Sequence, residues 1–420
     1  MNIIEKINSG VLPLITVVGT GYVGMPLIEQ FSKICPVIAY DINKKKIEKL
    51  SKNKNKNIRF TSDAVSLKMS DVIIVCVPTP IDSYNNPNLE YIKLACTTIA
   101  ENLKMGALII FESSYMPTCT EKLCIPLIEK VSGLENNKDF FIGYSPERIN
   151  PGDNKNTLNT ITKLIASSND QILNAMEFIY SKMAGINVYK INDIKVAEMS
   201  KLVENCQRDI NIAFMNELTK LCHKLDIDIN EVISAAGTKW NFMKFYPGLV
   251  GGDCVGVNSY YLMNLAEKYG EQLNVLETAR NTNLSVSKYI VEQLNEIVSK
   301  MGNNNDNNIK VTIYGYTYKE NTSDIRNTRV ADLYNELIKN NYLVEICDYN
   351  VSSDLEYLSV EDVDDSDIVI LAVPHVKYAN WDNIEITKKF DINSKYKVFI
   401  DLKSVYNKKT FPKNITYWHL

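Results

Sequence analysis

Short apolar runs alternate with amphipathic segments along the first half of the chain. The runs contain many β-branched residues and lie at 14–18, 37–40, 72–77 and 107–111. The segments between them place apolar residues at helical spacing. Alternation of short buried strands with helices predicts a parallel sheet that is covered by helices on both faces.

The same order of elements returns near the C-terminus. Apolar runs lie at 311–316, 343–348, 367–374 and 397–402, and a helical pattern lies at about 330–340. The sequence therefore predicts an α/β fold with two Rossmann-like, doubly wound parallel-sheet domains.

A long central helix is expected between these two halves. Residues 194–225 have a helical pattern without Gly or Pro, and a helix of this length spans roughly 45 Å at about 1.5 Å per residue. The polar, low-complexity segment 302–308 marks the last boundary. The expected domains are therefore 1–193, 194–302 and 303–420.

A glycine-rich turn, Gly19-Thr20-Gly21-Tyr22-Val23-Gly24, follows the first apolar run and precedes a helical pattern. In this setting the glycines permit a tight turn, close approach of the backbone to a pyrophosphate, and close packing of helix on strand. Asp41 stands at the end of the second run, where a carboxylate accepts ribose hydroxyls and repels a 2′-phosphate. The pattern predicts NAD rather than NADP as cofactor, and we interpret the lysines at 44–46 as a solvated helix face.

The second half lacks this turn. Its first apolar run leads into Gly315-Tyr316-Thr317-Tyr318-Lys319 instead. We therefore expect the second half to bind something other than the dinucleotide.

Composition and charge exclude several function classes. The chain has 420 residues, with 46 basic and 50 acidic side chains and a net charge of −4, which argues against a nucleic-acid partner. Its apolar runs are far shorter than the roughly 20 residues that cross a bilayer, and Glu5, Lys6 and the early glycine turn argue against a cleaved signal peptide. Nine cysteines and three histidines without metal-ligand spacing predict no metal site and reduced thiols in a cytoplasmic protein.

Four residues are candidates for catalysis. Cys254 lies in a glycine-rich loop, which favours a nucleophile over a core residue, whereas we assign the other eight cysteines to the core. Lys201 and Asn205 lie one turn apart on the central helix and could stabilise an oxyanion, although spacing alone favours a solvated stripe. Glu147 follows a short apolar strand; a single Glu in a loop is usually solvated.

Taken together, these segments resemble the UDP-glucose/GDP-mannose dehydrogenase family from Ile15 to about Leu402. The matching motifs are GTGYVG at 19–24, VPTP at 77–80, GYSPERINPGD at 143–153, AEMSKLVENCQRDINIAFMNEL at 197–218, GTKWNF and PGLVGGDCVGV between 237 and 257, and YKENTSDIRNTR at 318–329. The NPGD and GTKWNF segments look like the branch that acts on UDP-N-acetylhexosamines, especially the UDP-N-acetylglucosamine 6-dehydrogenases of surface-polysaccharide (capsule) pathways.

The resemblance implies NAD-dependent oxidation of the C6 alcohol of a nucleotide sugar to a carboxylate. It also implies an N-terminal NAD-binding domain (1–193), a central helical domain that forms a homodimer (194–302) and a C-terminal UDP-binding domain (303–420). Neither nucleic acid nor a membrane is an expected partner.

The resemblance further implies the roles of particular residues. Cys254 would form a thiohemiacetal and then a thioester, with Lys201 and Asn205 stabilising the oxyanion. Glu147 and Asn258 stand where water is activated, and Ser114 stands where a hydroxyl assists. The expected cofactor contacts are Gly19, Gly21, Tyr22, Val23, Gly24, Asp41, Pro78, Thr79, Ser114 and Arg326. The expected substrate contacts are Arg148, Lys201, Asn205, Tyr246, Gly248, Gly251 and Lys319.

Three positions depart from the family pattern. Asn258 replaces an aspartate, and an amide orients a water but cannot take its proton. Asp253 and Asn156 each replace a histidine of the N-acetyl branch, and a carboxylate beside the thiol should make the thiolate harder to form. Two alternatives therefore stay open: a UDP-glucose 6-dehydrogenase, or a catalytically weak nucleotide-sugar binding protein.

Overall fold

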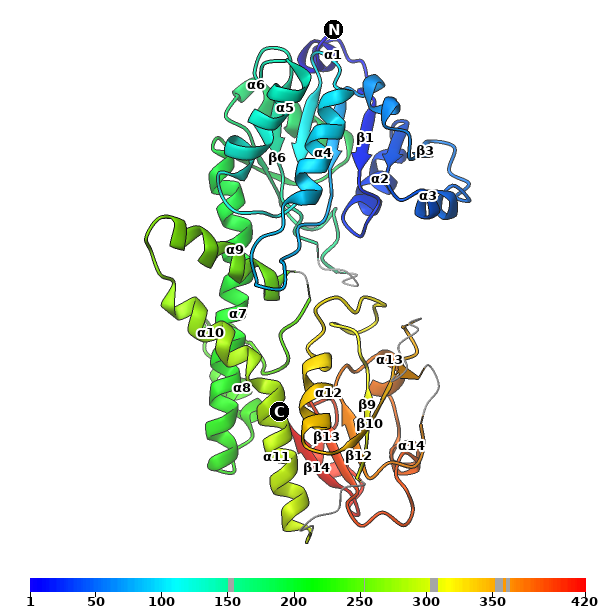
Figure 1. The fold of residues 1–420 in the computed structure, drawn as a ribbon, viewed down its shortest axis with the longest axis vertical. Helices are drawn as coiled ribbons and strands as arrows, with labels where there is room; N and C mark the ends of the chain where they lie inside the picture. The colour runs from blue at the N-terminus through cyan, green and yellow to red at the C-terminus, as the bar shows by residue number, and fades with distance from the viewer. Residues whose placement is uncertain (150–154, 253, 303–308, 352–357, 360–362) are drawn as a thin grey trace. The chain divides into compact units, whose positions relative to one another are not determined.

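The computed structural model describes residues 1–149, 155–252, 254–302, 309–351, 358–359 and 363–420. The chain forms two compact units (Figure 1). The first unit contains Met1–Glu204 and Tyr260–Glu271, and the second contains Asn205–Ser259 and Gln272–Leu420. The three-domain division expected from the sequence stays a prediction.

The first unit is built on an eight-stranded sheet with the order β3-β2-β1-β4-β5-β6-β7-β8. Its strands are β1 (Ile15–Val18), β2 (Val37–Tyr40), β3 (Ile58–Thr61), β4 (Val72–Val75), β5 (Leu108–Phe111), β6 (Phe141–Tyr144), β7 (Lys163–Ala166) and β8 (Val188–Ile191). Neighbouring strands are parallel except for β6 and β7, which are antiparallel. Every residue of β1, β2, β4 and β5 is buried, as expected for strands that are covered on both faces.

In the first unit α1 (Ile3–Asn8) precedes β1, and further helices connect the strands. These helices are α2 (Gly24–Ser32), α3 (Lys44–Leu50), α4 (Glu90–Glu101), α5 (Ile125–Ser132) and α6 (Asp170–Glu177). Leu27, Ile28 and Phe31 of α2 join the strand residues in one hydrophobic core.

The second unit is built on a six-stranded parallel sheet with the order β11-β10-β9-β12-β13-β14. Its strands are β9 (Lys310–Tyr314), β10 (Leu343–Cys347), β11 (Leu358–Ser359), β12 (Ile368–Leu371), β13 (Val398–Asp401) and β14 (Thr416–His419). Its helices include α8 (Ile229–Ala236), α10 (Asn274–Leu284), α11 (Val286–Lys300), α12 (Val330–Lys339), α13 (Val376–Ala379) and α14 (Asn383–Lys388). The strand order repeats that of β3 to β6 in the first unit, which confirms the two Rossmann-like sheets.

Two matched buried hydroxyl pairs underline this repeat. Thr16 of β1 bonds Ser70, and Thr312 of β9 bonds Ser366 in the same way. In each pair the threonine lies in the first strand of its sheet along the chain, and the serine comes just before the neighbouring strand, β4 or β12. The same local hydrogen bonding therefore holds equivalent strands in both sheets.

Two helices belong partly to each unit. The predicted central helix is α7, which runs without a break from Ile194 to Lys224. α9 covers Val255–Lys268. Among the described residues, none of the helices has the length and apolar character needed to span a membrane.

Candidate active site

The glycine turn after β1 fits a dinucleotide. Gly19 has a φ of +97°, and a Cβ there would lie 2.6 Å from the carbonyl oxygen of Cys76. A Cβ on Gly24 would lie 1.9 Å from the carbonyl oxygen of Gly19, whereas one on Gly21 would meet nothing within 4 Å. The turn therefore excludes side chains at two positions and leaves open space at the third, as close approach to a pyrophosphate requires. α2 begins at Gly24, and a helix N-terminus stabilises negative charge.

Asp41 is fixed at the end of β2. Its Oδ2 accepts the backbone N–H of Thr20 at 3.0 Å, the Thr20 hydroxyl at 2.7 Å and the Lys46 ammonium at 3.0 Å. Burial raises the pKa of Asp41, but hydrogen bonds from the amides of Asn43 and Thr20 outweigh burial and lower it. The carboxylate is thus anionic, as a ribose acceptor should be. Lys44 and Lys45 are exposed, as a solvated helix face requires, and the partly exposed Lys46 pairs with this carboxylate.

The segments after β4 and β5 supply further expected cofactor contacts. β1, β4 and β5 are parallel neighbours, so the residues after their carboxyl ends share one edge of the sheet. There the Thr79 hydroxyl donates to the carbonyl oxygen of Ser114 at 2.6 Å, next to Pro78 in sequence. Tyr22 is exposed, and Val23 is the N-cap residue of α2.

Glu147 is buried, although a lone loop glutamate is usually solvated. Its side chain follows β6 and is only 6% exposed. Oε1 accepts the backbone N–H groups of Arg148 and Ile149. Oε2 is also buried and has no hydrogen-bond partner among the described residues. Glu147 therefore keeps one acceptor atom for a bound group or water.

A buried charge cluster surrounds this carboxylate. The Lys163 ammonium lies 2.5 Å from Glu112 and 3.9 Å from Glu147, and the Tyr180 hydroxyl donates to Glu112 at 2.6 Å. Burial raises the pKa of Glu112 to about 7, although Lys163 opposes this shift. The sequence analysis missed Lys163 and Glu112. A charged residue beside an apolar strand run was the available signal, because a buried charge needs a partner.

The face of α7 that carries Lys201 and Asn205 is buried. The two side chains are 9% and 7% exposed, so the solvated stripe that their spacing favoured is wrong. Val196, Val203 and Phe214 are exposed instead. The Asn205 amide nitrogen is buried without a hydrogen-bond partner in the described part of the chain. It is therefore available to donate to an oxyanion.

Cys254 differs from the other cysteines. All nine lie within the described residues, and Cys254 is half-buried while the other eight are buried, as predicted. It directly precedes α9, whose N-terminus stabilises negative charge on a nearby atom. Asn258, one turn further on, is 3% exposed. Asp253 and residues 150–154 lie outside the described residues.

The loop before Cys254 is held by polar groups that the sequence analysis missed. The Asn216 side chain accepts the N–H of Gly248 at 2.9 Å and donates to its carbonyl at 3.1 Å. Arg280 donates to the carbonyl of Val250 at 3.4 Å. A Cβ on Gly251 would lie 2.5 Å from the carbonyl oxygen of Asn327. These contacts fix the backbone of the glycine loop within the second unit.

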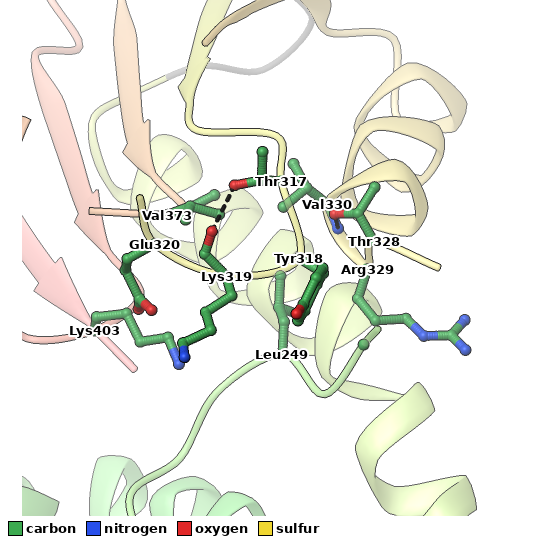
Figure 2. Close-up of a pocket in the computed structure, with 12 residues that line it drawn as sticks. Leu249, Thr317, Tyr318, Lys319, Glu320, Thr328, Arg329, Val330, Val373 and Lys403 are labelled. Atoms are coloured by element: carbon green, nitrogen blue, oxygen red, sulfur yellow. Dashed lines mark hydrogen bonds between the residues drawn. The ribbon is translucent and has the colours of Figure 1, made fainter. Parts of the chain in front are cut away.

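A pocket in the second unit contains the predicted residue Lys319 (Figure 2). It also contains two basic residues that the sequence analysis missed, Arg329 and Lys403. Lys403 follows β13, so its place at the carboxyl edge of the sheet was the available signal. The remaining lining residues are Leu249, Gly251, Thr317, Tyr318, Glu320, Thr328, Val330, Ala372 and Val373. The Arg329 guanidinium pairs with Asp332 at 2.9 Å and points away from the two lysines (Figure 2). Lys319 and Lys403 therefore supply the positive charge that suits an anionic ligand such as a diphosphate.

Three other residues that were expected to contact substrate or cofactor are Arg148, Arg326 and Tyr246. Arg148 of the first unit pairs with Glu204 at 2.8 Å. Arg326 of the second unit forms a bidentate pair with Asp324, from Nε to Oδ1 and from Nη2 to Oδ2. Tyr246 is exposed. Their roles toward substrate or cofactor stay predictions.

Three family models match the chain, and it belongs to the UDP-glucose/GDP-mannose dehydrogenase family. The NAD binding domain matches residues 13–184, the central domain 195–285 and the UDP binding domain 312–408. The chain is accordingly an NAD-dependent nucleotide-sugar dehydrogenase.

Individual relatives match along most of their length. Protein CapL of Staphylococcus aureus is 39% identical over 97% of this chain and 99% of its own. The UDP-N-acetyl-D-glucosamine 6-dehydrogenase of Salmonella typhi is 39% identical over 89% of this chain and 92% of its own. A solved UDP-D-ManNAc dehydrogenase from Pyrococcus horikoshii has a TM-score of 0.85 at 28% identity and covers 96% of this chain and 98% of its own.

Proposed function

We propose that this chain oxidises the C6 alcohol of UDP-N-acetylglucosamine to the uronic acid. Two relatives that carry the name UDP-N-acetyl-D-glucosamine 6-dehydrogenase are 39% and 38% identical to it. Relatives named UDP-N-acetyl-D-mannosamine dehydrogenase are 28% and 29% identical. The higher identity favours the glucosamine substrate.

UDP-N-acetylmannosamine is the second candidate substrate. The supporting observation is the likeness to the solved Pyrococcus horikoshii enzyme, whose TM-score is 0.85. The two sugars differ in configuration at one carbon, so a few loop contacts decide between them.

Oxidation of the C6 alcohol to a carboxylate removes four electrons from the C6 carbon. NAD, when bound, accepts a hydride in each of two successive steps. An aldehyde has no hydroxyl from which a second hydride can leave, so a nucleophile must add to it first. We assign this addition to the Cys254 sulfur, which gives a thiohemiacetal. Loss of the second hydride gives a thioester, and water then releases the acid and restores the thiol.

The observation that carries this proposal is the half-buried Cys254 thiol at the start of α9. Lys201 and the Asn205 amide nitrogen, which has no hydrogen-bond partner among the described residues, would donate to the oxyanion that forms when sulfur or water adds to the carbonyl carbon. Glu147 Oε2, which accepts no hydrogen bond from the described residues, would accept a proton from the hydrolytic water. Asn258 would orient that water, with Ser114 assisting.

The cofactor and the nucleotide would use separate sets of residues. The glycine turn, Asp41 and the Thr79 segment would bind NAD. The basic pocket with Lys319 and Lys403 would bind the UDP diphosphate.

We also propose a homodimer formed through α7. The apolar side chains Val196, Val203, Phe214 and Leu221 are between 49% and 56% exposed, and exposed apolar stripes on helices mark association surfaces. Light scattering of the purified protein tests this; a monomer at all concentrations would contradict it. The cytoplasmic location and the role in capsule synthesis stay predictions.

Incubation of the purified protein with NAD and a panel of UDP-sugars tests the reaction. We expect two NADH and one uronic acid for each UDP-N-acetylglucosamine, measured by absorbance and mass spectrometry. Faster turnover of UDP-N-acetylmannosamine or UDP-glucose would show that this sugar, and not UDP-N-acetylglucosamine, is the preferred substrate. Binding of UDP-sugar without NADH formation would instead indicate the catalytically weak binding protein.

A further inference from the structure

A buried imidazole in the second unit plays no part in the proposed chemistry. His375 follows β12 and is completely buried. Its Nε2 lies 3.0 Å from Oδ2 of Asp348, and its Nδ1 lies 2.8 Å from the backbone nitrogen of Asn321. Because an amide N–H can only donate, Nδ1 is the acceptor and Nε2 carries the proton. A neutral imidazole thus joins a carboxylate to a loop.

Asp348 occupies the position in the second sheet that Asp41 occupies in the first. Each carboxylate directly follows the strand beside the first strand of its sheet. Asp348 accepts the N–H groups of Tyr316 at 2.7 Å and Thr317 at 3.2 Å, and its other oxygen accepts that of Asn350 at 2.9 Å. It is completely buried. Asp348 therefore holds the chain itself and has no access to a ribose.

The loop that Asp348 and His375 hold forms one wall of the basic pocket. Four consecutive residues, 317–320, line the pocket. Asp348 holds the start of this loop, and His375 holds its end through Asn321. The Asn321 side chain also accepts the backbone N–H of Val376 at 2.9 Å.

The backbone of Lys319 is fixed between these two anchors. Its carbonyl oxygen accepts the Thr317 hydroxyl at 2.7 Å, drawn as the dashed line in Figure 2, and the Thr322 hydroxyl at 3.1 Å. The Lys319 side chain lines the pocket. Hydrogen bonds at both ends and in the middle of the loop thus fix the backbone from which the Lys319 side chain extends into the pocket.

We propose that His375 is a positioning residue for the nucleotide: by bridging Asp348 and Asn321 it holds the Lys319 loop in place to bind the diphosphate. This inference rests on the proposed function of the pocket. The imidazole itself does not touch the ligand. Its rigid ring offers one donor and one acceptor on opposite sides, and an aliphatic side chain of similar size offers neither.

The test compares UDP binding by the full-length wild type, His375→Leu and His375→Gln in isothermal titration calorimetry. We expect His375→Leu to weaken UDP binding about tenfold or more, which is about 1.4 kcal/mol of binding free energy. His375→Gln restores much of this affinity, because its amide supplies one donor and one acceptor. KM for the UDP-sugar should be lowest in the wild type, higher in His375→Gln and highest in His375→Leu, while KM for NAD stays unchanged.

Thr312→Val is the matched control. This variant loses the buried hydrogen bond between Thr312 and Ser366. Thr312 lies within β9, away from the end of the strand where the loop begins. The variant should therefore lower the free energy of unfolding without changing UDP affinity. If His375→Leu does not fold, His375→Asn takes its place, because its side-chain oxygen can replace Nδ1 as acceptor for the Asn321 N–H, whereas the shorter side chain does not reach Asp348.

Each outcome has one meaning. Wild-type affinity in His375→Leu or, if that variant does not fold, in His375→Asn would overturn the positioning role and leave the proposed function standing. An equal loss in Thr312→Val would also overturn it, because the effect would then be general destabilisation. A wild type that does not bind UDP would overturn the pocket's proposed function and this inference with it.

Discussion

Replacing Arg280 by methionine tests how the buried polar network behind the glycine loop is stabilised. The guanidinium is 1% exposed, and its Nη1 lies 3.0 Å from Oδ1 of Asp209, which is completely buried. Asp209 also accepts the Ser259 hydroxyl and the Asn283 amide, each at 2.7 Å. The variant would leave a carboxylate in the interior without its cation.

Breaking a buried ion pair by removing one partner costs about 3–5 kcal/mol. We expect the lower end, about 3 kcal/mol, because the bonds from Ser259 and Asn283 remain and stabilise the carboxylate. For a folding unit of this size, each kcal/mol lowers Tm by roughly 2–4 °C. The melting temperature should therefore fall by about 6–12 °C.

A double-mutant cycle measures this coupling. Urea unfolding of the wild type, Arg280→Met, Asp209→Asn and the double variant gives four free energies of unfolding. Asn in place of Asp209 has no charge; its oxygen can still accept from Asn283, and its NH2 group can donate to the Ser259 hydroxyl oxygen. The double variant should therefore be more stable than Arg280→Met. Additive losses, or a loss below about 1 kcal/mol in Arg280→Met, would refute the reasoning.

Three further variants test other parts of the site. Cys254→Ala should abolish acid formation from a supplied 6-aldehyde, and undiminished oxidation of that aldehyde would mean another nucleophile. Asn258→Asp should speed the second half-reaction, since a carboxylate can take the proton of water; equal or slower NADH release per product acid would contradict this. Burial raises the pKa of Glu112 from 4.5 to about 7, so between these values the folded chain holds a proton that the unfolded chain has lost. The free energy of unfolding of the wild type, relative to that of Glu112→Gln, should therefore fall as the pH rises through this window. If urea unfolding gives the same pH dependence for both proteins, this prediction is wrong.

The two sheets show how one architecture serves two ligands. Gly19 and Gly315 both have a positive φ, of +97° and +89°, at the end of the first strand. Asp41 lies at the end of β2 in the first sheet, whereas its counterpart Asp348 is fully used by backbone amides and His375. The two sites therefore differ both in the glycine turn and in the partners of the equivalent carboxylate.

The two α/β halves and α7 could be predicted from local sequence. Apolar runs of four to six residues that are rich in β-branched side chains are too short for buried helices and indicate strands, and an uninterrupted helical pattern needs no distant partner. The glycine turn was equally local, because close packing between Gly19 and Gly24 arises within six residues. For the same reason the odd position of Cys254, in a loop rather than a core segment, could be found from spacing alone.

Only the tertiary structure decided which polar residues are buried and what each one holds. Lys163 and Glu112 are 51 positions apart, and Arg280 and Asp209 are 71 apart. Helical spacing places Lys201 and Asn205 on one face but does not say whether that face meets solvent or protein. Because the cost of burying a charge depends on a partner that the fold supplies from elsewhere in the chain, a local pattern can flag a buried charge but cannot name its partner.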